Sequence, residues 1–343
     1  MSDSVAQPAR DPAAPALGPD GAKMSRGVGL RSARLWLGLG LSAASVYLVV
    51  RGITWAEVSS TLLHVRWWPV LLAWLVVIVT LASKAERWRL LFWPQHRQVG
   101  WLRLFGIMLA GQLVNFAFPG RVGDLGRIYF VGQGGGVRRA VVATSIAVEK
   151  TVDLIMTLAL LALLLPVMAV PGWLRDSALG LTVVTLLLLL TLAGLTWWGG
   201  GALPWLSLPL RILPERVQRP LADQLALALT GLRALRQARI LAGVVFWSAV
   251  VWVTSVLTNY LVFMGLDLAL GWKAALFLLL VLMLGTAIPS SPGKIGVFHY
   301  LAVLGLVPFA VEKPVALSVS LILYVIAYSP AVVVGSAFLL RQR

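Results

Sequence analysis

Residues 115–127, NFAFPGRVGDLGR, decide how this chain folds. They close an apolar run that begins at residue 105, yet they hold two arginines and one aspartate within seven residues. Proline or glycine at positions 119, 120, 123 and 126 prevents the helix from simply continuing through the stretch. Charge and irregular backbone are tolerated at membrane depth only where protein or a watery cavity surrounds them. The stretch therefore predicts a broken helix that lines a protected cavity in a membrane.

A second stretch of the same kind lies about 170 residues further on, at 287–296, AIPSSPGKIG. Two interrupted apolar segments in corresponding places are typical of a transporter whose site lies between internal repeats. The alternative for this second stretch is an ordinary tight turn between two full spans.

The composition fits only a polytopic membrane protein: 59% of the 343 residues are hydrophobic and 12% are charged. The net charge of +16 is spread between apolar segments, which indicates the positive-inside bias and attraction to anionic lipid headgroups and argues against a nucleic-acid partner. The chain has no cysteine, and its three histidines (His64, His96 and His299) are far apart. We therefore predict no metal site and no cofactor.

The predicted fold is all-α, with about six full spans and two broken or re-entrant hairpins of opposite orientation, resembling an inverted repeat. Residues 1–30 are rich in Ala, Pro, Gly and Asp and predict a disordered cytoplasmic tail, followed by a single membrane domain over 31–343. Leucines at helical spacing predict an amphipathic segment at the inner interface within 203–239. The predicted spans are 35–50, 67–83, 140–165, 178–198, 240–265 and 315–340, and the predicted hairpins are 104–131 and 274–309.

Basic residues fix the predicted orientation. With 84–103 taken as a cytoplasmic loop, twenty of the 29 Lys and Arg residues lie on the cytoplasmic side, five lie outside and four lie at membrane depth. We therefore expect a bacterial cytoplasmic (inner) membrane protein with both termini in the cytoplasm.

The span after the first hairpin contains SIAVEKTVDL, residues 145–154. Ser145, Glu149 and Asp153 are four residues apart and share one helical face, with Lys150 in the same sector. Four intramembrane cations then face three acids (Asp124, Glu149 and Asp153), and we expect Arg127 and Lys150 to be surplus and to meet a lipid phosphate.

The candidate substrate-binding residues are polar groups at or beside the two breaks: Asn115, Arg121, Asp124, Arg127, Glu149, Lys150, Asp153, Ser290, Ser291, Lys294 and His299. Bland alternatives stay open for each group. The buried charges can form a purely structural ion-pair network, Asn115 can form a structural hydrogen bond between helices, and His299 can be a plain interior residue. No catalytic residue is predicted.

At these motifs the chain resembles a flippase-like family built on the membrane region of lysylphosphatidylglycerol synthase. The resemblance rests on NFAFPGRVGDLGR, SIAVEKTVDL and IPSSPGKIGVFHY in this order and spacing, and it spans about residues 35–340. Lys294 and His299 depart from the pattern, because the family has glycine and glutamate there. The resemblance implies movement of lipids between leaflets. The 343 residues leave no room for the soluble aminoacyl-transferase domain, so we expect no lipid aminoacylation by this chain.

The favoured hypothesis is a lipid flippase or transporter, not an enzyme, and it involves no nucleotide hydrolysis because no phosphate-binding loop motif is present. Its partners are a membrane lipid substrate and anionic headgroups, and the residues do not choose among a phospholipid, an aminoacylated lipid, a hopanoid and a polyprenyl-linked lipid. One alternative is an integral-membrane transferase with Asp124 or Glu149 as base. Another is a membrane partner of a separate lipid- or glycan-modifying enzyme, with 203–239 as the docking surface.

Overall fold

The computed structural model of the protein describes residues 40–95, 98–118, 121–133, 137–168, 172–207, 232–286 and 291–342. This described part is helical throughout and contains no strand. Its α-helices, in chain order, are Gly40–Val50, α2 (Trp55–Leu63), α3 (Trp67–Leu90), α4 (Trp101–Ala117), α5 (Val122–Gln133), α6 (Arg139–Leu164), α7 (Gly172–Ser207), α9 (Ala238–Gly265), α10 (Trp272–Gly285), α11 (Val297–Leu306) and α12 (Lys313–Arg341).

Six helical stretches within the described residues are long and apolar enough to cross a membrane, which makes the chain a multi-pass membrane protein. Four of them contain the predicted spans 67–83, 140–165, 240–265 and 315–340, and a fifth, Leu179–Trp198, matches the predicted span 178–198 to within one residue. The sixth, Pro292–Phe309, belongs to the predicted second hairpin and reaches its length only because short 3₁₀ turns flank α11. The first predicted span, 35–50, is described only as the helix Gly40–Val50.

The predicted end of the second span is wrong. Helix α3 continues to Leu90, so Lys84 and Arg87 lie on a helix and not in a cytoplasmic loop. Arg87 is buried, and its guanidinium finds a carboxylate and a hydroxyl on neighbouring helices. A charge inside a membrane protein is tolerated when it faces such partners instead of lipid.

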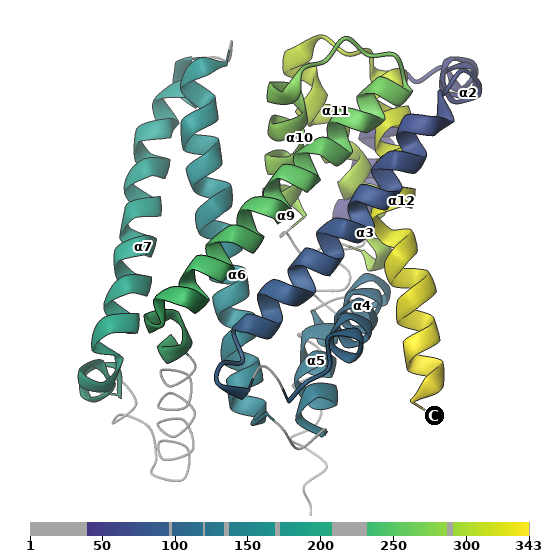
Figure 1. Ribbon diagram of the computed structural model, residues 1–343. Helices are drawn as coiled ribbons and strands as arrows, with labels where there is room; N and C mark the ends of the chain where they lie inside the picture. Colours follow the sequence, from purple (N-terminus) through teal and green to yellow (C-terminus); the bar gives the residue numbers. More distant parts are fainter. Residues whose placement is uncertain are drawn as a thin grey trace, which may run out of the picture.

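Figure 1 shows two pairs of shorter helices at opposite ends of the bundle. The α4–α5 pair lies at the end that carries the C-terminus, and the α10–α11 pair lies at the other end, the end at which α2 lies. These four helices have 17, 12, 14 and 10 residues, whereas a straight crossing takes about 20. The long helices α3, α9 and α12 run past both pairs.

Each pair of short helices packs into its own hydrophobic core. One core joins the start of α3, the end of α9 and helices α10, α11 and α12. The other joins the end of α3 with α4, α5, the start of α6 and residues 232–244. Helix α3 therefore spans both cores, and an ion pair between Arg66 and Asp267 (3.0 Å) ties its beginning to the end of α9.

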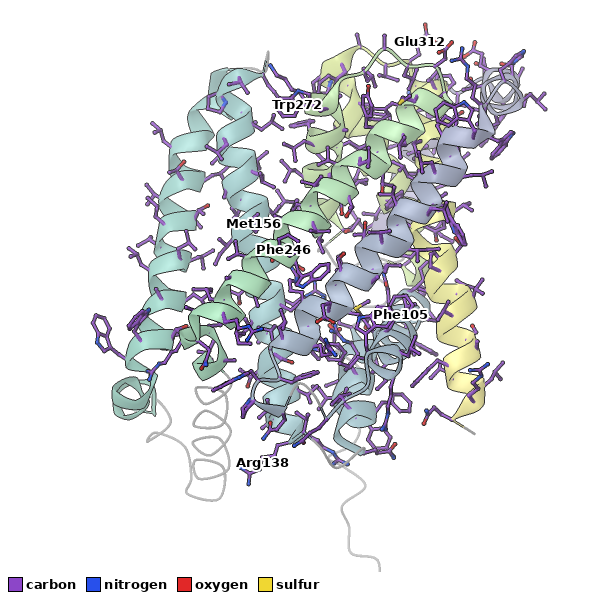
Figure 2. The ribbon with its side chains drawn as sticks, viewed as in Figure 1. Phe105, Arg138, Met156, Phe246, Trp272 and Glu312 are labelled. Atoms are coloured by element: carbon purple, nitrogen blue, oxygen red, sulfur yellow. The ribbon has the colours of Figure 1, made fainter. Side chains whose placement is uncertain are left out.

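The basic connections between helices lie at one end of the bundle. Figure 2 shows Arg138, between α5 and α6, at the opposite end of the molecule from Glu312, which precedes α12. Helix α7 extends to Ser207, beyond the predicted return span, and so takes up the beginning of the predicted amphipathic segment. The predicted tail 1–30 and residues 208–231 of that segment lie outside the described residues.

Candidate functional site

The first break is a tight connection between two closely packed helices. Phe118 has extended backbone after α4, and Arg121 just before α5 has φ of 56°. Helices α4 and α5 meet at Gly111 and Gly123, where a Cβ on Gly123 would overlap the carbonyl oxygen of Gly111. The pattern of small residues thus lets two backbones touch, as glycine does elsewhere between membrane helices.

Asn115 ties the two helices together. Its side-chain oxygen accepts a hydrogen bond from the Gly123 amide (2.7 Å), and its amide nitrogen donates to Asp124 Oδ1 (3.3 Å). Asn115 therefore bonds one of the amides that the start of α5 leaves without an intrahelical acceptor. This contact fixes Asp124 on the inner side of the hairpin.

Arg127 forms the centre of a buried charge network. Its guanidinium lies 2.7 Å from Glu149 and 3.4 Å from Asp124, and it stacks 4.0 Å above the ring of Trp88. Only 4% of the Arg127 side chain and 7% of the Glu149 side chain are exposed. The expectation that Arg127 is a surplus cation is therefore wrong, because two carboxylates and an aromatic face already surround it.

A second buried pair lies one turn along α6. Arg87 on α3 contacts Asp153 at 2.8 Å and donates to the Ser248 hydroxyl at 3.2 Å. Trp88, its neighbour, donates to the Ser145 hydroxyl at 2.9 Å. Since Ser145 and Asp153 both contact α3, and Glu149 between them is buried, the predicted polar face of α6 is confirmed.

The lysines of the site are less well compensated. Lys150 Nζ is 3.8 Å from Glu149, and 43% of its side chain is exposed. Lys84 makes no ion pair or hydrogen bond with any residue that the structure describes, although it faces the same network. A cavity of about 110 Å³ lies between them, with polar groups over much of its wall. Its lining residues are Leu81, Lys84, Met108, Gln112, Asn115, Asp124, Arg127, Glu149 and Lys150.

At the second break, Gly293, Lys294 and Gly296 all have positive φ, of 75°, 55° and 87°. Tyr324 of α12 donates to the Gly293 carbonyl (2.7 Å), and the Ser291 amide donates to the hydroxyl of Ser42 (3.0 Å). These bonds hold the irregular backbone against two other helices. Ser290 lies outside the described residues.

The two breaks approach each other inside the bundle. The 3₁₀ turn Pro292–Lys294 packs against α4, and Phe116 near the end of α4 lies 4.7 Å, centroid to centroid, from the Tyr328 ring. Arg121 and Lys150 are the charged groups whose fields act on Lys294, and both repel it. Within the described ranges Arg121 and Lys294, one at each break, have no ion pair.

The predicted site residues thus divide into groups. Asn115, Asp124, Arg127, Glu149 and Lys150 line one cavity. Asp153 pairs with Arg87 and lines a neighbouring space of about 20 Å³. Ser291 and His299 lie apart from both, and the His299 ring contacts the Ser320 hydroxyl at 2.9 Å.

Sequence reasoning missed Lys84, Arg87 and Trp88 as members of the site. Thr80, Lys84 and Arg87 follow one another at helical spacing, which was a signal that the helix continues with a polar face. Within the described residues there is no group of three or more His, Cys, Asp or Glu side chains that could hold a metal ion.

A third hollow is apolar and lies between α3 and α12. It has a volume of about 560 Å³, and the Trp74 indole donates to Ser329 at its wall (2.9 Å). Its apolar lining suits hydrocarbon and not a headgroup.

Fold and site together define a polytopic membrane protein with two interrupted helix pairs around buried charges. The chain belongs to the family of the lysylphosphatidylglycerol synthase TM region, whose family model matches residues 35–335. No curated protein and no solved structure matches the chain significantly.

Proposed function

We propose that this chain is a lipid transporter that moves a lipid with a phosphate-bearing or polar headgroup between the leaflets of the bacterial inner membrane. One observation supports this most: Arg121 and Lys294, one at each broken helix pair, have no ion pair within the described residues, and Lys150 on α6 has only a 3.8 Å contact with Glu149. A positive charge at membrane depth is costly unless an anion joins it, and a lipid phosphate is the anion most available there. Membership of the synthase membrane-region family is consistent with a lipid cargo.

In this proposal both helix pairs are re-entrant. The α4–α5 pair enters from the cytoplasmic side and the α10–α11 pair enters from the outer side, with both termini in the cytoplasm. Each pair is too short to cross a hydrocarbon core of about 30 Å twice at full length. Irregular backbone then lies at membrane depth but inside protein, the only place where lipid-embedded proteins tolerate it.

The headgroup phosphate would lie against Arg121, Lys150 and Lys294, with the acyl or isoprenoid tails left in the bilayer. Arg121 and Lys294 have no ion pair within the described residues and Lys150 is 43% exposed, whereas Arg127 is already neutralised by carboxylates. Arg127, Glu149 and Asp124 then hold the hairpin in place instead of contacting the lipid. No chemical step is part of the proposal.

The geometry gives less support to an integral-membrane transferase. Such an enzyme needs a carboxylate free to accept a proton. Asp124, Glu149 and Asp153 are each within ion-pair distance of an arginine. An arginine beside a carboxylate favours its ionised form and makes it a weak base.

Reconstitution with labelled phosphatidylglycerol in vesicles tests the proposal. We expect labelled lipid to cross the bilayer unchanged, and we expect Lys150→Met and Lys294→Met each to slow this crossing about tenfold or more. That magnitude corresponds to loss of one charge-assisted hydrogen bond of about 1.5–3 kcal/mol. Lys273→Met, on the exposed first turn of α10, is the matched control and should transport at the unmodified rate.

Each outcome discriminates among the three functions. Chemically altered lipid would indicate a transferase instead. Lipid that neither moves nor changes would point to a partner of another enzyme. Equal transport by all three variants would remove the phosphate site from the proposal.

A further inference from the structure

Lys84 occupies a position that lipid binding alone does not explain. It lines both the 110 Å³ cavity beside Lys150 and the 20 Å³ space beside Asp153, and so joins the two. It lies six residues before the end of α3, about 9 Å along the helix axis. That end of α3 is the end of the bundle where the basic loops gather. Lys84 is thus a titratable group inside the membrane domain with a short route to water.

The groups that surround Lys84 come from its own helix and from five others. Asp153, Arg87, Lys150 and Glu149 are the charged side chains whose fields act on it. Asp124 and Arg127 of α5 share its larger cavity, with Gln112 and Asn115 of α4. The residues of α9 and α10 that line the smaller space are all uncharged: Val251, Trp252, Ser255, Leu279 and Met283.

The network around Lys84 contains four cations and three carboxylates. The cations are Lys84, Arg87, Arg127 and Lys150, and the carboxylates are Asp124, Glu149 and Asp153. Each carboxylate is within 3.4 Å of an arginine, and arginine stays charged under all physiological conditions. With Arg87, Arg127 and Lys150 charged, the net charge of the network is zero when Lys84 is a neutral amine. It carries one extra positive charge when Lys84 is protonated.

That extra charge has no anion inside the network to offset it. Arg121 and Lys294 at the meeting of the breaks add further positive charge on the side of Lys150. An uncompensated charge in low-dielectric surroundings is costly, and lysine, unlike arginine, can escape the cost by losing its proton. A phosphate that enters the cavity would supply the missing negative charge.

Resting on the proposed transport of an anionic lipid, we propose that Lys84 is a proton-binding site whose occupancy is linked to that of the headgroup. When the phosphate enters, the Lys84 amine takes one proton from the aqueous phase and becomes an ammonium group. When the phosphate leaves, the ammonium returns that proton to water. Binding of the headgroup is thereby coupled to uptake of one proton, and its release is coupled to loss of that proton.

Thermodynamic linkage makes the coupling reciprocal. If a bound anion favours the protonated lysine, then protonation favours the bound anion by the same factor. Raising the pH should therefore weaken binding of an anionic lipid. A zwitterionic lipid of the same chain length brings no net charge and should show much less of this dependence.

Calorimetric titration of the full-length protein in detergent tests this directly. The probes are short-chain phosphatidylglycerol and short-chain phosphatidylcholine, each in two buffers at one pH whose ionisation enthalpies differ. The difference in apparent binding enthalpy between the buffers gives the number of protons taken up. We expect uptake of up to about one proton per phosphatidylglycerol and close to none for phosphatidylcholine.

Three variants assign the proton to Lys84. Lys84→Arg keeps the charge permanently, so it should bind phosphatidylglycerol without proton uptake. Lys84→Met should bind about tenfold more weakly, again without uptake. Lys273→Met should behave as the unmodified protein, and because the unmodified protein alone gives a proton count, a variant that fails to fold does not block the test.

Proton uptake of zero in the unmodified protein overturns the inference, as does full uptake by Lys84→Arg or the absence of phosphatidylglycerol binding. Lipid crossing in vesicles separates this result from the proposed function. Lipid that crosses without proton uptake removes the coupling and keeps the transporter. Proton-linked binding without crossing keeps the Lys84 site and removes the transporter.

Discussion

At the scale of single residues, two arginine–carboxylate pairs of similar length have very different surroundings. Arg127 and Glu149 are 2.7 Å apart and almost fully buried, whereas Arg66 and Asp267 are 3.0 Å apart with 59% and 73% of their side chains exposed. Water screens an exposed pair, and such pairs contribute about 0–1 kcal/mol. Removal of one partner of a buried pair leaves an uncompensated charge, which costs about 3–5 kcal/mol.

We therefore predict that Glu149→Gln lowers the free energy of unfolding by about 3–5 kcal/mol, while Asp267→Asn lowers it by no more than about 1 kcal/mol. Unfolding in mixed detergent can be followed by intrinsic fluorescence, since the chain has 15 tryptophans. Equal, small effects of the two changes would show that Arg127 finds water or another anion when Glu149 is lost.

The same residues mark the limit of prediction from sequence. The acids Glu149 and Asp153 could be placed on one face of α6 from their spacing alone. Their partners could not be chosen, because Arg121 and Arg127 both belong to the first hairpin and Arg87 is on a helix far away in the chain. Folding selects Arg127, since it lies one turn into α5 and faces α6, whereas Arg121 precedes that helix. The stacking of Arg127 on Trp88 could not be predicted, because Trp88 belongs to no sequence motif that indicates this contact.

At the scale of helices, apolar run lengths predicted the long spans well, because a membrane demands about 20 consecutive apolar residues. The end of α3 was mispredicted because its charged residues were taken to mark the end of the apolar span. Arg87 instead pairs with Asp153 on another helix, so the helix continues past it. The two breaks were predictable because glycine and proline disrupt helices locally. The close packing of α4 against α5 was not predictable, because it depends on a contact between Gly111 and Gly123.

That contact gives a prediction for the first hairpin. Gly123→Ala should destabilise the protein by at least about 1–3 kcal/mol, because the added Cβ meets the backbone carbonyl of Gly111, which a side-chain rotation cannot relieve. Gly126→Ala is the matched control in the same helix, since a Cβ there meets nothing within 4 Å among the described atoms. It should be neutral or stabilising by about 0.5–1 kcal/mol. Thermal unfolding of both variants checks this, and equal stability of the two would mean that α4 and α5 are further apart.

At the scale of the whole molecule, the arrangement predicts which surfaces face the cytoplasm. Gln133 ends α5 at the end of the bundle where the basic loops gather, and Glu312 lies before α12 at the other end; both are exposed. Lysine and arginine favour the cytoplasmic side of a membrane. The predicted orientation rests on charge, and the predicted depth of α4 and α5 rests on their length.

We predict that Gln133→Cys is protected from the outside and that Glu312→Cys is accessible. The chain has no cysteine of its own, so each variant carries a single thiol. A membrane-impermeant maleimide applied to intact spheroplasts should label Glu312→Cys at once and Gln133→Cys only after the membrane is opened. Labelling after lysis serves as the control that each thiol is reactive.

Labelling of Gln133→Cys in intact spheroplasts would mean that α4 crosses the membrane completely, and the re-entrant arrangement of the first helix pair would then be wrong. Protection of Glu312→Cys would instead invert the orientation, placing the surplus positive charge nearer to the outer leaflet and reversing the side from which Lys84 exchanges its proton.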